Sequence, residues 1–401
     1  MSFLISKALI YAVPLMVVAL AGVFAERSGV INLALEGIMI FGAFVGALTI
    51  NLMQKANTFE IINLAKNMSS NWGKVQAFLL LIMLITAVAG AIFSLLLALA
   101  AINLKADQTI GGTALNMLSP ALVCFFIRLI AQQSELRMYK GDAASWFMIK
   151  KTMLGFEKTQ DIGFLGETFL NKVYLTTYIS ILLFVVLSIL LYKTRFGLRL
   201  RSCGENPQAS ASLGINVYKM RYSGVMISGA LAGLGGFVYT LTTSNCVANG
   251  DVAGFGFLAL AVMIFGNWKP LSIAGAALLF GLFKCVAASY STLDINGDGV
   301  FLLLNLSKDP TWGKIFNPHL YRLIPYVISL VVLAFTSKKS RAPKAEGIPY
   351  DKGQRLSDHT AKKAPVHDAR EPFIHYANYA RAAFRSFFRS SPRCRMGEMR
   401  L

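Results

Sequence analysis

The chain has 401 residues, of which 55% are hydrophobic and only 15% charged. A soluble domain carries about 25% charged and 45 to 50% apolar residues, so this composition excludes an ordinary soluble protein and requires a lipid environment. The formal net charge of +19 does not indicate a nucleic-acid partner, because the basic residues flank apolar blocks and gather in one tail.

Apolar blocks of about 20 residues recur along the chain, which is the length that an α-helix needs to cross a hydrocarbon core of about 30 Å. Because backbone polar groups find no partner in hydrocarbon, these blocks must be helices, and the fold class is an all-α, polytopic transmembrane bundle. We predict eight or nine spans, near residues 8–25, 31–53, 77–102, 109–130, 173–192, 220–243, 270–290 and 320–336, with a shorter block at 252–266 that is either a tilted span or a re-entrant segment.

Two basic segments predict the orientation, because cationic loops mark the cytoplasmic side. The tail from Lys338 holds 15 Lys and Arg against 6 Asp and Glu, and the loop from Lys193 to Arg221 holds a second cluster. Placing both inside gives a cytoplasmic C-terminus, an outer N-terminus and an extracytoplasmic insert at 131–172. That insert carries as many basic residues as the inner loop, although long loops follow the charge rule only weakly.

Residues 1–337 form the predicted transmembrane domain, and residues 338–401 form a cytoplasmic basic tail. Prolines and polar residues interrupt the tail, so we expect most of it to be disordered. Near its end, aromatic residues recur every three or four positions and Arg381, Arg385 and Arg389 every four. This pattern is typical of an amphipathic helix on anionic lipid, with a dispensable solvated tail as the alternative.

The loop at 194–219, which lies between two predicted spans, carries the most specific pattern. Basic residues open it, and Gly204 and Pro207 are expected to interrupt the helix. The following QASASLG predicts a short helix that Gly214 can end as a C-cap. Such a helix, with small residues and a polar start, offers a rigid contact to a soluble partner, whereas an ordinary capped loop is the alternative.

This run resembles the coupling loop of ATP-binding-cassette (ABC) importer permeases of the simple-sugar, nucleoside and branched-chain amino-acid group. The segments ERSGVINLALEG (26–37), GGTALNMLSPA (111–121) and GFGFLALAVMIFGNWKP (254–270) are also similar, so the resemblance covers most of residues 10–337. The insert at 131–172, the 293–318 loop and the tail depart from it. The resemblance implies an ABC importer permease fold, in which these residues engage the ATPase: Gly204, Glu205, Asn206, Pro207, Ala209, Gly214, Ile215 and Asn216.

The resemblance further implies a permease in the cytoplasmic membrane that pairs with a second permease subunit, homologous or identical, and with an ABC ATP-binding subunit. Substrate would arrive from an extracytoplasmic binding protein. ATP and Mg²⁺ would be used by the partner, because this chain has no GxxxxGK[ST] phosphate loop and no apparent catalytic set of residues. A nucleoside or simple sugar is the expected solute, with riboflavin and branched-chain amino acids as alternatives.

Three polar residues within the spans, Asn32, Glu36 and Asn116, are candidates for the translocation path, because ionisable and polar groups are expensive at membrane depth. The alternative is structural. Glu36, expected a turn or two from the cytoplasmic end, would bond a neighbouring helix, and Asn116 would make an interhelical hydrogen bond of about 0.6 to 2 kcal/mol. An ion-coupled transporter would need several such carboxylates, and a passive channel is a further alternative.

Small residues predict close helix packing at Gly229, Gly233 and Gly236 in the segment SGALAGLGG. A weak internal similarity links residues 33–42, LALEGIMIFG, with residues 258–266, LALAVMIFG, as in transporters built from repeats. The five cysteines are scattered, and DINGDG at 294–299 lacks the late Glu of a calcium loop. We therefore predict no metal site and no cofactor held by this chain.

Overall fold

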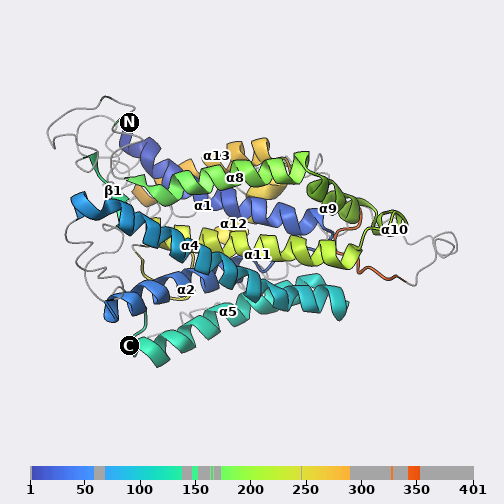
Figure 1. Ribbon diagram of the computed structural model, residues 1–401, viewed down its shortest axis with the longest axis horizontal. Coiled ribbons are helices and arrows are strands. Elements are labelled where there is room, and N and C mark those ends of the chain that lie inside the picture. Colours follow the sequence, from blue (N-terminus) through green and yellow to red (C-terminus); the bar gives the residue numbers. More distant parts are fainter. Residues whose placement is uncertain are drawn as a thin grey trace, which may run out of the picture. The chain divides into compact units, whose positions relative to one another are not determined.

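A computed structural model describes residues 2–57, 68–137, 147–151, 163, 166, 173–244, 246–289, 327 and 342–352. Contacts divide the chain into two units, residues 1–350 and 351–401, of which the first holds the helices discussed here. Its long helices run side by side, with α9 and α10 together at one end and β1 at the other (Figure 1). The long helices are α1 (Ser2–Arg27), α2 (Leu35–Lys55), α4 (Met68–Ala98), α5 (Gln108–Ala131), α8 (Leu175–Lys193), α11 (Val217–Thr242) and α13 (Pro270–Ser289).

Shorter elements complete this unit. A π-helical turn η2 (Leu99–Asn103) extends α4, and α9 (Arg195–Glu205), α10 (Pro207–Ser212) and α12 (Phe255–Phe265) are the short helices. The strands β1 (Met148–Ile149) and β2 (Val173–Tyr174) pair antiparallel, with Met148 opposite Tyr174. The predicted block at 173–192 therefore begins with two residues of strand before α8.

The predicted transmembrane helical bundle is confirmed. Six helices in the described part of the chain are long and apolar enough to cross a membrane: Ile5–Arg27, Leu35–Lys55, Trp72–Asn103, Gln108–Ala131, Leu175–Lys193 and Val217–Thr242. Two shorter apolar helices, α12 and α13, coincide with the predicted blocks at 252–266 and 270–290. The predicted block at 320–336 lies outside the described residues, except for position 327.

The short helix α12 does not have the length of a full span. Its 11 residues cover about 16 Å at 1.5 Å per residue, about half of a hydrocarbon core of about 30 Å. Phe255 lies beside Tyr11, and an added side chain at Gly22 would meet Met263. The helix therefore follows α1 from near its middle to its Arg27 end, which fits the re-entrant interpretation.

Helix α11 forms the centre of the bundle, and its glycines allow neighbouring backbones to approach closely. A Cβ at Gly229 would come within 2.6 Å of the Gly90 carbonyl oxygen of α4, and one at Gly233 within 2.9 Å of the Gly90 Cα. On the other side, a Cβ at Gly236 would lie 2.0 Å from the Met39 carbonyl oxygen of α2. The three predicted packing glycines thus stand where α11 meets α4 and α2.

The internal similarity does not correspond to matching places in the fold. Residues 33–42 include the end of a loop and the first two turns of α2, whereas residues 258–266 run through to the C-terminal end of α12. The aligned residues therefore start at different points of their helices. Common apolar residues account for the likeness as well as a repeat does.

The start of the predicted insert is tied to the Lys55 end of α2. Asn51 donates to the Arg137 carbonyl at 2.6 Å, and Leu136 pairs with Ala248 in an isolated bridge. Most of residues 138–172, the calcium-like DINGDG segment and the C-terminal amphipathic pattern lie outside the described residues. The first compact unit extends to Tyr350, beyond the predicted boundary at residue 337.

We expect Gly233→Ala to lower the stability of the folded protein by about 1 to 3 kcal/mol, because the added methyl must displace the backbone of α4. Thermal unfolding of the detergent-solubilised protein measures this change. Gly275→Ala is the matched control, since a Cβ at Gly275 would meet no atom within 4 Å. Equal melting temperatures for the two variants would contradict the packing role of Gly233.

Candidate coupling surface and translocation site

The predicted coupling loop folds as two short helices joined at Asn206. Helix α9 runs through Gly204 and ends at Glu205, so the expected break at Gly204 is wrong, and the chain turns only at Asn206. The Asn206 side chain accepts a hydrogen bond from the Ala209 N–H at 3.0 Å and caps α10, whose first residue is Pro207. This order, a capping Asn followed by Pro, is the usual start of a helix.

The end of α10 also follows its sequence pattern. Gly214 adopts a left-handed conformation with φ of 79°, directly after the C-cap residue Leu213. The Gly214 and Ile215 N–H groups donate back to Ala211 and Ser210, and the Asn216 side chain then caps α11 through Lys219. Helix α10 is therefore held at both ends and connects rigidly into α11.

Gly204 and Glu205 attach this loop to the end of α1. A Cβ on Gly204 would lie 2.4 Å from the Arg27 carbonyl oxygen, so only glycine fits without a shift of the backbone. The exposed Glu205 forms an ion pair of 3.3 Å with Arg27. The outward surface of α10 remains open: Ala209, Ser212 and Gly214 are exposed, and Leu213 is 81% exposed. These residues present a small apolar knob, which we call the coupling knob.

The three candidate path residues meet around the start of α2. Asn32 donates to the Ser228 hydroxyl at 2.8 Å and accepts from the Ala34 N–H. Asn116 of α5 accepts from the Gly37 N–H at 2.8 Å and donates to a nearby carbonyl of the loop before α2. The side-chain amides of Asn32 and Asn116 therefore both hydrogen-bond to backbone groups near the start of α2. Such bonds between neighbouring segments are what the structural alternative predicted.

Glu36 caps the N-terminus of α12. One carboxylate oxygen accepts from the Gly254 N–H at 3.0 Å, and the other accepts from the N–H groups of Gly256 and Phe257 at 2.5 and 3.2 Å. A negative charge there complements the positive end of the helix dipole and satisfies three otherwise orphan donors. Glu36 is only 7% exposed, so these hydrogen bonds replace the lost hydration of its carboxylate.

The start of α2, which carries Glu36, lies partway along its neighbours α11 and α1. The loop before α2 runs along α11, where its Asn32 binds Ser228, eleven residues beyond Val217 and about 16 Å along the helix at 1.5 Å per residue. The start of α12, which Glu36 caps, lies beside the middle of α1. The expectation of a position one or two turns from the membrane surface assumed a continuous helix from residue 31. Non-helical backbone between α1 and α2 removes that assumption.

Several contacts at the α9 end escaped sequence reasoning. Residues 342–350, which we call the strap, lie against the coupling loop: the Ala345 N–H donates to the Gly204 carbonyl at 2.9 Å. Arg221 of α11 is 1% exposed and donates to the Ile348 carbonyl at 2.9 Å. Glu26 of α1 accepts from the Trp268 indole N–H. No local motif announces such long-range contacts, although Glu26 and Arg221 are charged residues near the ends of predicted spans.

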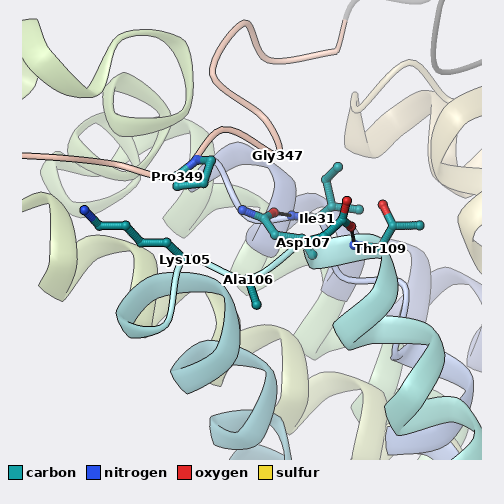
Figure 2. A pocket seen from close by; sticks show the side chains of 8 residues that line it. Ile31, Lys105, Ala106, Asp107, Thr109, Gly347 and Pro349 are labelled. Carbon is teal, nitrogen blue, oxygen red and sulfur yellow. Dashed lines mark hydrogen bonds between the residues drawn. The ribbon is translucent and has the colours of Figure 1, made fainter.

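A pocket of about 340 Å³ opens between the loop after α1, the start of α5 and the strap (Figure 2). Figure 2 shows Lys105 on one side of this pocket and Asp107 and Thr109 on the other, with Pro349 above. Asp107 caps α5 by accepting from two backbone N–H groups. The pocket is lined by Ile31, Lys105, Ala106, Asp107, Gln108, Thr109, Gly347 and Pro349.

Comparison with known proteins decides the family. Residues 4–333 match the family described as branched-chain amino acid transport system / permease component. The chain belongs to this permease family. The permease is 40% identical to the guanosine ABC transporter permease protein NupQ of Bacillus subtilis and 34% identical to the nucleoside ABC transporter permease protein NupC of Lactococcus lactis; each match covers 88% of this chain and 98% of the relative.

A putative glucose ABC transporter permease protein of Haloferax volcanii is 26% identical over 81% of this chain and 88% of its own length. No solved structure matches the permease. Membership of an ABC permease family implies an ATP-binding subunit and a substrate-binding protein as partners. Together with the apolar helices, it makes the permease a multi-pass membrane protein.

We expect Glu36→Ala to destabilise the permease more than Asp107→Ala does. The first variant leaves three buried N–H groups at the start of α12 without a partner, which costs about 1 to 3 kcal/mol of folding stability. The second removes an exposed cap of α5, typically about 1 kcal/mol. Melting temperatures of both variants in the same detergent test this order. A shift for Glu36→Ala no larger than that for Asp107→Ala would count against the buried cap.

Proposed function

We propose that the permease moves nucleosides into the cell as one of two permease subunits of an ABC importer. The similarity to two nucleoside permeases over 98% of their length carries this proposal. A glucose permease is the less similar relative, so a simple sugar is the second candidate. Branched-chain amino acids and riboflavin are the further alternatives within the same family.

The site chemistry also supports an uncharged solute. Half-helix N-termini near the membrane midplane often bind anionic groups of substrates. In this permease the Glu36 carboxylate already occupies the three donors at the start of α12. A solute carboxylate would have to displace it against charge repulsion, whereas a nucleoside or sugar carries no such group.

Energy would enter through the coupling knob. The separate ATPase binds ATP and Mg²⁺, and this chain holds no cofactor of its own. When the ATPase domains close, they would push α10, and the caps at Asn206 and Asn216 would pass this movement to α9 and α11. Because α11 packs backbone to backbone against α4 and α2, the helices would move as a rigid body and switch the accessible side. This arrangement requires the coupling loop and the C-terminus in the cytoplasm.

Proteoliposomes that contain the permease pair, its ATPase and the binding protein should accumulate radiolabelled guanosine only when ATP is hydrolysed. Excess unlabelled nucleoside should compete, whereas glucose, leucine and riboflavin should not. Competition by one of these other solutes would reassign the substrate. Accumulation without ATP and binding protein would reject the importer in favour of a secondary transporter or channel.

Gly214→Val should reduce ATPase binding and ATP-driven uptake at least tenfold while leaving membrane insertion intact. A β-branched residue at a φ of 79° strains the backbone by about 1 to 2 kcal/mol and misplaces the coupling knob. Glu205→Lys should act similarly by turning the ion pair with Arg27 into repulsion. Co-purification of the tagged ATPase measures the loss.

Gly275→Val is the control for Gly214→Val, since both positions leave open space for a side chain but only Gly214 has positive φ. It should retain ATPase binding and uptake. Normal complex assembly in both coupling variants would show that the 204–216 segment is an ordinary capped loop.

A further inference from the structure

The strap is fixed to α9 and α11 by hydrogen bonds of its own backbone. The Ala345 N–H donates to the Gly204 carbonyl, near the end of α9, at 2.9 Å. Three residues later, the Ile348 carbonyl accepts from Arg221 of α11 at 2.9 Å, and Arg221 is only 1% exposed. Because both bonds use backbone groups of the strap, they fix its path along the coupling loop and bring its last residue, Tyr350, to that loop.

The side chain of Tyr350 packs among all three helices of the coupling region. Tyr350 is only 6% exposed and lies in one apolar cluster with Cys203 of α9 and Val217 of α11. Its ring packs edge-on against Tyr218 of α11, with ring centroids 5.2 Å apart. Ala211 of α10 packs against the same cluster. One aromatic side chain from the strap therefore belongs to a cluster that α9, α10 and α11 share.

The two joints beside α10 leave its direction open. Asn206, between α9 and α10, has φ −150° and ψ 93°, and Asn216, before α11, has φ −77° and ψ 99°, so neither residue continues a helix. Their side chains cap α10 and α11, but a cap fixes the end of one helix and not the angle between two helices. With six residues, α10 depends on packing for its position. The cluster against its less exposed side therefore decides how far α10 yields to a push.

We propose that Tyr350 is a positioning residue for the coupling helix: its ring supports α10, so that a push on the coupling knob moves α9 and α11 instead of bending the loop at Asn206 and Asn216. Without the ring, a space opens beside α10 and the push is absorbed there. The ATPase would still bind the knob and hydrolyse ATP, but it would move less solute for each ATP. This effect on transport rests on the proposed function, whereas the support of α10 by the strap does not.

Hydrogen exchange of the complete complex in nanodiscs, read by mass spectrometry, tests the support of α10. Tyr350→Ala should lower the protection of peptides covering 207–216 by about tenfold or more, because truncation of a buried aromatic ring leaves a cavity. Tyr350→Phe keeps the ring and should keep the protection. Ile348→Ala is the matched control, since it lies in the same strap, its side chain is 56% exposed, and its backbone carbonyl still accepts from Arg221. Equal protection of α10 in Tyr350→Ala and Ile348→Ala would overturn the proposal.

The number of ATP molecules hydrolysed per guanosine imported, measured in proteoliposomes, separates positioning from assembly. In Tyr350→Ala this ratio should rise about tenfold, because a helix that is supported in about a tenth of the molecules transmits about a tenth of the pushes. Co-purification of the ATPase should be unchanged, Tyr350→Phe should restore the ratio, and Ile348→Ala should leave it as it was. A fall in uptake that only follows a loss of bound ATPase, at an unchanged ratio, would overturn the positioning role.

Gly347→Val provides a second test that leaves Tyr350 in place, in case Tyr350→Ala does not fold. Gly347 has φ of 74°, and a Cβ there would come within 2.8 Å of the Ile31 side chain, so a β-branched residue should displace the strap. Peptides covering 342–352 and 207–216 should then lose protection together. A displaced strap with normal protection of α10 would overturn the proposal. Absence of ATP-driven guanosine uptake in the unmodified complex would instead reject the proposed function, and hydrogen exchange would still decide whether the strap supports α10.

Discussion

Close backbone contact around α11 is the constraint on which the rest of the bundle depends. In lipid, apolar side chains gain little by leaving hydrocarbon, so helices associate through tight packing and hydrogen bonds. Gly229, Gly233 and Gly236 provide this packing, because each lets α11 touch a neighbouring backbone directly. The same helix begins at the coupling loop, so movement of its first turn is transmitted to its partners.

Buried charge is handled inside the bundle in two different ways. The Glu36 carboxylate is matched by three backbone donors of α12, and its position beside the middle of α1 makes it part of the architecture. The buried Glu26 of α1 accepts from the Trp268 indole N–H instead. The first arrangement holds the start of a helix, whereas the second ties the end of α1 to the segment after α12.

The coupling loop and the strap form one structural unit. Because Gly204 has no side chain, it packs directly against the backbone of α1, and its carbonyl oxygen accepts a hydrogen bond from the strap. Arg27 ties the same end of α9 to α1 through its ion pair with Glu205. Because these contacts share residues, a movement of the strap is expected to reach the coupling loop.

The sequence by itself determined the elements whose causes are local. Apolar block length predicted the spans, the segment QASASLG after Pro207 predicted a short helix that Gly214 ends, and the glycines of SGALAGLGG predicted close packing. The tertiary structure alone decided the partners of Glu36 and the break before α2, because these depend on which backbone donors lie opposite. It also decided that the strap meets Gly29 and Arg221, since contacts between residues more than 100 positions apart leave no periodic pattern in the chain.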